Sequence, residues 1–185
     1  MTDTQKTRVA VLVGSLRADS VNRKLAELLR DEAATDVVLD IVEGLDRLPF
    51  YNEDIDGENA PAAAVAVRER VALADRVLAV TPEYNGTLPA VLNNAIDWLS
   101  RPYGAGAISG KPFAVIGTTP TPYGGKWAHE DAARSAGIAG AKVVADATVS
   151  HPAGEGDVLV DRDARAKLHD AIAKLVAFAP ETTAA

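Results

Sequence analysis

Hydroxyl, amide and guanidinium side chains gather in the segment GSLRADSVNRKLA, which begins at Gly14. They stand at the start of a stretch with helical spacing, where free amide hydrogens and the positive end of the helix dipole stabilise an anion such as a phosphate. The alternative is a serine that only caps the helix and an arginine in solvent. The segment has neither G-x-G-x-x-G nor GxxxxGK[ST], so a dinucleotide fingerprint or a P-loop does not explain it. We predict ligand contacts at Ser15, Arg17, Ser20, Val21 and Asn22.

A second segment, VTPEYNGTLPAVLNNAIDWL, carries a hydrophobic run into a proline, a tyrosine and an Asn-Gly pair before a helix begins. Asn85-Gly86 favours positive φ, which lets amides and carbonyls face a planar heterocycle, and Tyr84 adds an aromatic surface. The alternative is an ordinary turn with a buried tyrosine. Trp98, farther along, is expected in the core or at a subunit interface.

The third segment, GTTPTPYGGKWAHE, begins at Gly117 and holds two prolines and Gly124-Gly125 before a helix. Small residues let a ligand approach the main chain closely. A rigid surface turn would need the same residues, so both interpretations stay open for this segment.

The elements that must position these segments alternate between strand and helix patterns. Strands are expected at 8–13, 36–42, 75–81, 111–118 and 141–149, and helices at 20–34, 60–74, 88–99, 127–137 and 162–178. In the fourth helix, Gly137 is expected to close the C-terminus. Five such βα units predict an α/β fold: a doubly wound, five-stranded parallel sheet with helices on both faces.

In an open α/β sheet, ligands bind beyond the carboxyl ends of the strands, where the strand order reverses. Each of the three segments leaves such an end. A phosphate site beside a hydrogen-bonding, partly aromatic loop fits a phosphorylated planar ring. FMN at the reversal point of a flavodoxin-like sheet is therefore the expected ligand.

The composition limits the alternatives. The 185 residues, 48% of them hydrophobic, predict a single domain over 1–185 with flexible ends at about 1–6 and 180–185. A net charge of -7 argues against nucleic acid or an anionic membrane as partner, and the absence of cysteine removes thiolate chemistry. The apolar run near the N-terminus is too short for a signal peptide or a membrane span, so a cytoplasmic location is expected.

Several other site types lack their residue patterns. The three histidines, His129, His151 and His169, have no metal-ligand spacing, so surface or capping roles are expected and no metal site is predicted. No G-x-S-x-G elbow supports a hydrolase. A phospho-acceptor regulator of this topology would carry aspartate where Thr81-Pro82 stand.

In its first two segments the sequence resembles the NADPH-dependent FMN reductase family of flavodoxin-like proteins, which includes chromate and quinone reductases. The matching pieces are GSLRADSVNRKLA and TPEYNGTLPAVLNNAIDWLSR, in the same order and at similar spacing. The resemblance implies that Ser15, Arg17, Ser20 and Asn22 hold the FMN phosphate. It implies that the isoalloxazine is lined by Pro82, Glu83, Tyr84, Asn85 and Gly86.

The third segment departs from the family pattern, which usually has a serine and glycines followed by GG-x-R. Here the chain has Thr118, Thr119, Gly124, Gly125 and Lys126. A ring contact at Thr118 is implied. Lys126 stands near the position of the family's arginine. Any role of that arginine in a substrate or subunit contact therefore has no direct counterpart in this chain.

The resemblance also implies an activity: hydride passes from NAD(P)H to bound FMN, and electrons pass on to a quinone, free flavin or another small acceptor. No acid-base side chain is required, and Glu83 is expected to be structural. A homodimer or homotetramer is implied. Two alternatives stay open. One is a flavin-binding electron carrier without pyridine-nucleotide oxidase activity, although the loop with Arg17 argues against it. The other is an assembly protein that keeps the fold but has lost FMN.

Overall fold

Valine-rich runs form the centre of a parallel sheet in the computed structural model, which describes residues 6–179. β1 (Thr7–Val13), β3 (Arg76–Val80) and β4 (Pro112–Thr119) are buried over most or all of their lengths. Strands covered on both faces need such continuous apolar sequences. The edge strand β2 (Val37–Ile41) is only partly buried.

The strand order β2-β1-β3-β4-β5 and the parallel pairing confirm the flavodoxin-like, doubly wound fold. From β1 the chain moves outward to β2 and then returns to β3 on the other side of β1. The order therefore reverses between β1 and β3, which is where such sheets bind ligands.

The fifth position of the sheet is interrupted, so the continuous strand expected at 141–149 is wrong. β5 (Lys142–Val143) pairs with the start of β4, a 3₁₀ turn follows at Ala145–Ala147, and β6 (Val149–Pro152) pairs with the end of β4. The sequence Ala-Asp-Ala has low strand propensity, and the turn buries Ala147 completely.

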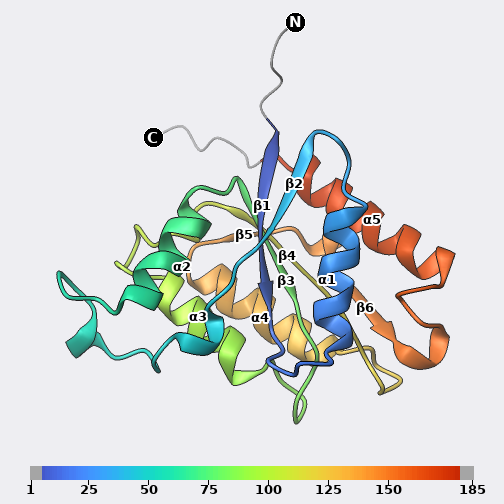
Figure 1. Ribbon diagram of the computed structural model, residues 1–185, viewed down its shortest axis with the longest axis horizontal. Helices are drawn as coiled ribbons and strands as arrows, with labels where there is room; N and C mark the ends of the chain where they lie inside the picture. The colour runs from blue at the N-terminus through green and yellow to red at the C-terminus, as the bar shows by residue number, and fades with distance from the viewer. Residues whose placement is uncertain (1–5, 180–185) are drawn as a thin grey trace, which may run out of the picture.

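Helices cover both faces of the sheet, as expected (Figure 1). α1 (Val21–Asp31) and α5 (Arg162–Ala177) pack on one face. α2 (Ala62–Ala72), α3 (Ala90–Leu99) and α4 (Lys126–Ile138) pack on the other. The fully buried Trp98 lies in this second core and donates from Nε1 to the Pro49 carbonyl at 2.8 Å, so it is a core residue.

One helix end differs from its prediction. α4 continues past Gly137, and the helix closes at Gly140, whose φ is +96°. The Ala141 amide donates to the Ala136 carbonyl at 2.9 Å and the Gly140 amide to the Gly137 carbonyl at 3.1 Å. This is a Schellman motif, which needs a residue that tolerates positive φ just beyond the helix.

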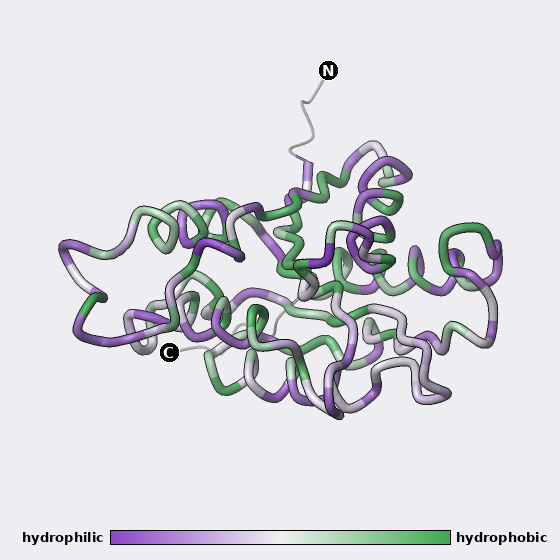
Figure 2. The backbone as a smooth tube through the Cα atoms, turned by 60° about the horizontal axis from the view of Figure 1, so that its bottom comes forward, coloured by the Kyte–Doolittle hydropathy of each residue, from purple (hydrophilic) through white to green (hydrophobic). Residues whose placement is uncertain are grey.

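The carboxyl ends of the strands point to the bottom of Figure 1, where the loops after β1, β3 and β4 lie together. Figure 2 brings this edge toward the viewer. The segment between β2 and α2 projects at the left of both views and is largely hydrophilic. No helix within residues 6–179 has both the length and the apolarity to cross a bilayer. The ends predicted to be flexible lie outside the described residues, apart from Lys6.

Candidate functional site

A cavity of about 430 Å³ opens at the carboxyl edge of the sheet, a volume within the usual range of ligand pockets. The three predicted loops form most of its wall. Nine of the eleven predicted site residues line it: Ser15, Arg17, Ser20, Val21, Asn22, Pro82, Glu83, Tyr84 and Thr118. Asn85 and Gly86 are outside the lining, at the tip of the second loop.

The first loop brings a helix N-terminus and a cation to the cavity. Ser20 is the N-cap of α1, and its Oγ accepts from the Arg23 amide at 3.2 Å. The first amides of α1 point out of the helix, as at any N-terminus. Arg17 is exposed and forms no ion pair within the part of the chain that the structure describes. Its guanidinium can therefore turn to an anion without breaking an existing pair.

Asn22 joins the first loop to the third. Its side-chain Nδ2 donates to the Thr118 carbonyl at 2.9 Å, and its Oδ1 accepts from the Thr118 amide at 3.0 Å. Both polar ends of the buried side chain are thus occupied by protein. The Asn22 side chain ties α1 to the end of β4, and only its backbone amide, in the first turn of α1, remains for a ligand.

The Thr118 hydroxyl has no partner. Among residues 6–179, the Thr118 Oγ1 is buried and makes no hydrogen bond, whereas the other buried side-chain oxygens and nitrogens have partners. Leaving such a group unsatisfied costs about 1–3 kcal/mol, so native proteins rarely do so without a reason. Thr118 lines the cavity, so a ligand bound there lies beside this residue and is a candidate partner for its hydroxyl.

The second loop has the backbone that its sequence predicted. Asn85 has φ +54° and Gly86 has φ +73°. Tyr84 and Thr87 exchange backbone hydrogen bonds of 3.1 Å across this pair. Two consecutive positive φ values in a two-residue hairpin are the geometry that Asn-Gly favours. Tyr84 is half-exposed, so the alternative of a turn with a buried tyrosine does not apply.

Glu83 holds the second loop against α4. Its Oε2 accepts from the amides of Trp127 at 3.1 Å and Ala128 at 3.2 Å, which are unpaired donors of the first helical turn. The carboxylate therefore caps α4 from another loop. This agrees with the structural role expected for Glu83, with a partner that lies outside its own loop.

Glycines bring the strand ends together around Thr81. A Cβ on Gly14 would lie 2.1 Å from the Thr81 Oγ1, and a Cβ on Gly117 would lie 2.1 Å from the Thr81 carbonyl oxygen. In the third loop, Gly124 has φ +63°, and a Cβ there would lie 2.7 Å from the backbone of β6. The small residues of this loop thus approach protein main chain. Lys126 pairs with Glu130 at 3.7 Å on the exposed side of α4.

A fourth wall of the cavity was not predicted. It consists of Ala153, Gly156, Asp157, Val158 and Leu159, whereas Thr119 and Pro120 belong to the third predicted loop. The signal was present in HPAGEGD, a turn-forming stretch that follows the last expected strand at the same edge of the sheet. The segment is held by His151, whose Nε2 donates to the Gly156 carbonyl at 2.9 Å.

The expected surface or capping roles are wrong for two histidines. His129 and His151 are buried, because the α4–β6 junction closes over them, whereas His169 pairs with Glu32 at 2.9 Å near the surface. Burial lowers the pKa of His129, and the Thr81 carbonyl and Glu83 oppose this shift. The described residues contain no group of three or more metal-ligating side chains.

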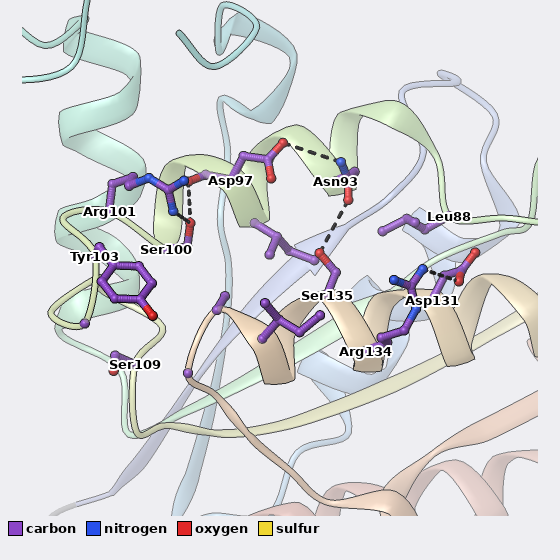
Figure 3. A pocket seen from close by; sticks show the side chains of 15 residues that line it. Leu88, Asn93, Asp97, Ser100, Arg101, Tyr103, Ser109, Asp131, Arg134 and Ser135 are labelled. Atoms are coloured by element: carbon purple, nitrogen blue, oxygen red, sulfur yellow. Dashed lines mark hydrogen bonds and ion pairs between the residues drawn. The ribbon is translucent and has the colours of Figure 1, made fainter. Parts of the chain in front are cut away.

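A second cavity, of about 500 Å³, lies between α3 and α4 (Figure 3). None of the predicted site residues lines it. Arg134 donates to Asp131 at 2.8 Å, and Arg101 donates to the Ser100 hydroxyl at 2.8 Å. Burial raises the pKa of Asp97, which lies above the groove near Asn93. The charged groups of this groove mostly have protein partners, so the first cavity is the better ligand site.

Comparison with known proteins gives a consistent result. The family model described as NADPH-dependent FMN reductase matches residues 7–156. A quinone reductase of Pseudomonas putida is 50% identical over 117 residues, 63% of this chain and 62% of that protein. A 2-hydroxy-1,4-benzoquinone reductase of a Burkholderia species is 47% identical over 112 residues, 60% of each chain. The match thus spans less than two thirds of these curated relatives.

Solved structures extend the likeness over most of the chain. FerB, a flavoenzyme NAD(P)H:(acceptor) oxidoreductase of Paracoccus denitrificans, is 34% identical with a TM-score of 0.79, covering 91% of this chain and 95% of FerB. The azoreductase AzrA, at 20% identity and a TM-score of 0.63, shares the fold over 93% of this chain and all of its own.

Proposed function

The chain belongs to the NADPH-dependent FMN reductase family, and from this we propose that it binds FMN in the carboxyl-edge cavity and is an NAD(P)H-dependent oxidoreductase. Its electron acceptors are quinones, free flavin or other small molecules. The observation that carries the proposal is the buried hydroxyl of Thr118, a residue that lines this cavity beside a helix N-terminus and the Arg17 side chain. Neither the hydroxyl nor the Arg17 guanidinium has a hydrogen-bond or ion-pair partner among residues 6–179.

The residues present fit FMN. The α1 N-terminus, Ser15, Ser20 and the Arg17 guanidinium offer donors of the kind that hold a phosphate. Pro82, Tyr84 and Thr118 would contact the ring, with Tyr84 as its aromatic neighbour. Asn85 and Gly86 act through the shape of the turn that presents Tyr84.

Bound FMN would supply the hydride-accepting and electron-donating chemistry. The chain's own task is to bind the phosphate, orient the ring and fix the approach of both small molecules. Among the pocket-lining side chains, the carboxylates of Glu83 and Asp157 accept hydrogen bonds from backbone amides. They are thereby tied to loop structure, which agrees with a site that needs no protein acid or base.

An absorbance experiment tests this function. Purified protein reconstituted with FMN should show flavin bands that bleach when NADPH is added without oxygen. In air, it should oxidise NADPH steadily with menadione as acceptor. Flavin bands without NADPH or NADH oxidation would favour the electron carrier, and a protein that cannot be reconstituted would favour the assembly protein.

Quinones are the first acceptors to test, because two relatives at 50% and 47% identity are named as quinone reductases. The choice between NADH and NADPH is measured in the same assay. A cytoplasmic location is proposed with this activity, since the pyridine nucleotides that it consumes are cytoplasmic reductants, and cell fractionation tests it.

We also propose that the chain forms a homodimer or homotetramer through the groove between α3 and α4. Tyr103 and Ile138, which line this groove, are 91% and 78% exposed, and large apolar side chains in such positions are typical of interfaces. Light scattering should give a multiple of the 19.3 kDa chain mass, and Ile138→Asp should lower it. Leu73→Asp, at a comparably exposed apolar residue on another surface, is the control. A monomeric mass at all concentrations would contradict the proposal.

A further inference from the structure

We propose that His129 is a positioning residue of the cofactor pocket. Its neutral imidazole, together with the first two turns of α4, sets the loop Thr81–Thr87 in the shape that receives the FMN ring. This inference rests on the proposed function and assigns a role to a buried side chain outside the cavity lining.

The partners of His129 fix its tautomer. Its Nε2 lies 3.2 Å from the Thr81 carbonyl oxygen, which can only accept, so Nε2 carries the hydrogen. Its Nδ1 lies 2.7 Å from the Ser150 Oγ. In a neutral ring Nδ1 is then an acceptor, and the Ser150 hydroxyl donates to it. One side chain thus connects α4, the end of β3 and β6.

α4 holds the loop at three successive points. His129 holds its start through the Thr81 carbonyl. The amides at the start of α4 hold its middle through the Glu83 carboxylate. Asp131 holds its end by accepting from the Thr87 hydroxyl at 2.6 Å. The residues that line the cavity from this loop, Pro82 to Tyr84, lie between the first and last of these contacts.

The contact at Thr81 is the one with least freedom to rearrange. Thr81 is completely buried, and its amide donates to the Ile116 carbonyl at 3.0 Å. Around the imidazole, a Cβ on Gly117 or Gly125 would lie 3.1 or 3.2 Å from Nε2. The two glycines therefore let the ring sit directly against the strand ends. Removing the ring would leave the Thr81 carbonyl without its side-chain donor and leave a space beside the strand ends.

Two substitutions separate the hydrogen bond from the packing. His129→Leu removes the donor, and it should weaken FMN binding about tenfold to a hundredfold, as expected for an unmade buried hydrogen bond. His129→Gln keeps an amide donor that can reach the Thr81 carbonyl, and it should bind FMN within about threefold of the unaltered protein. Quenching of flavin fluorescence measures both affinities.

Ala132→Gly is the matched control. It lies on the buried side of α4 close to His129 and lowers helix stability without touching Thr81. The FMN-free variants are first compared by thermal unfolding. The inference is overturned if His129→Leu binds FMN as tightly as the unaltered protein, or if Ala132→Gly weakens binding as much.

A measurement on the unaltered protein keeps the inference testable if the His129→Leu variant does not fold. Nitrogen-15 NMR of the FMN-free protein should show His129 as the neutral Nε2–H tautomer at pH 7. The opposite tautomer, or a charged ring, would overturn the inference. If the unaltered protein binds no FMN, the proposed function fails, and the NMR result still reports separately whether His129 holds Thr81.

Discussion

At the scale of single residues, the Thr118 hydroxyl allows ligand binding to be separated from folding. Thr118→Val keeps the side-chain shape and removes the unpartnered oxygen. We expect the FMN-free protein to gain on the order of 1 kcal/mol in unfolding free energy, because a buried unsatisfied group is lost. FMN binding should weaken by roughly tenfold. Urea unfolding and flavin titration measure the two effects, and unchanged affinity would show that the hydroxyl makes no ligand contact.

Arg17 is expected to contribute charge to the phosphate site. Arg17→Ala should weaken FMN binding about tenfold to a hundredfold, because a charge-assisted hydrogen bond is lost. Stability should stay nearly constant, since Arg17 is exposed. Arg30→Ala, at the far end of α1 where Arg30 pairs with Asp31 at 2.9 Å, is the control. Equal flavin titrations for both variants would make Arg17 a surface residue only.

The sequence predicted which residues face the cavity better than it predicted what each one does. Ser20 and Arg17 line the cavity, and their positions follow from local features, a helix cap and a loop cation. That they bind the phosphate stays a prediction. The tie between Asn22 and Thr118 joins residues 96 positions apart, and nothing local in either segment reveals it. The burial of His129 likewise depends on β6 and on glycines from other loops.

At the scale of elements, Asn22 fastens α1 to the end of β4. Asn22→Ala would leave the buried amide and carbonyl of Thr118 without partners. We expect a loss of about 2–6 kcal/mol in unfolding free energy, from two buried groups at about 1–3 kcal/mol each. Urea unfolding measures it. Asn93→Ala, which removes only contacts of 3.4 and 3.5 Å on α3, should cost much less. Similar losses would mean that the tie is not energetically important.

The alternating strand and helix patterns predicted the order of elements correctly, because parallel strands buried on both faces must be continuous apolar runs. The break between β5 and β6 was not predicted. The break is flanked by Val144 and Val149, which have high strand propensity. Only the packing of α5 against Ala145–Ala147 reveals that these residues leave the hydrogen-bonded pairing with β4. The end of α4 was also missed, since two glycines were available and the chain takes positive φ at Gly140 rather than at Gly137.

At the scale of the whole molecule, His129 should make stability depend on pH. Burial lowers its pKa below the ordinary 6.5, so below that pH the unfolded chain takes up a proton that the folded chain does not. The unfolding free energy should therefore fall as the pH drops from about 6.5 toward the folded pKa, and be unaffected by this group above 6.5. Thermal unfolding between pH 5 and 8 measures this, and His129→Gln should flatten the curve in that window.

The carboxylates act in a lower window. The hydrogen bonds of Arg68 to Asp56 and of Arg23 to Glu43 lower the pKa of these carboxyl groups. Their contribution to the unfolding free energy is present above the ordinary carboxyl range near pH 4 and is lost as the pH falls through the lowered pKa values.

We propose that the chain unfolds as a single domain, so tryptophan fluorescence and circular dichroism should give one coincident transition.

The control for the His129 prediction is the slope of stability against pH. If His129→Gln leaves the slope between pH 5 and 6.5 unaltered, groups other than His129 cause the pH dependence in that window.

A crystal structure of the chain with FMN would show whether the carboxyl edge between β1, β3 and β4 is built for this cofactor. We predict the phosphate at the N-terminus of α1 within hydrogen-bond distance of Ser15, Ser20 and Arg17, and the ring beside Tyr84 with the Thr118 hydroxyl bonded to it. Density for FMN in the groove between α3 and α4, or at no site under saturating FMN, would mean that this edge is not the FMN site.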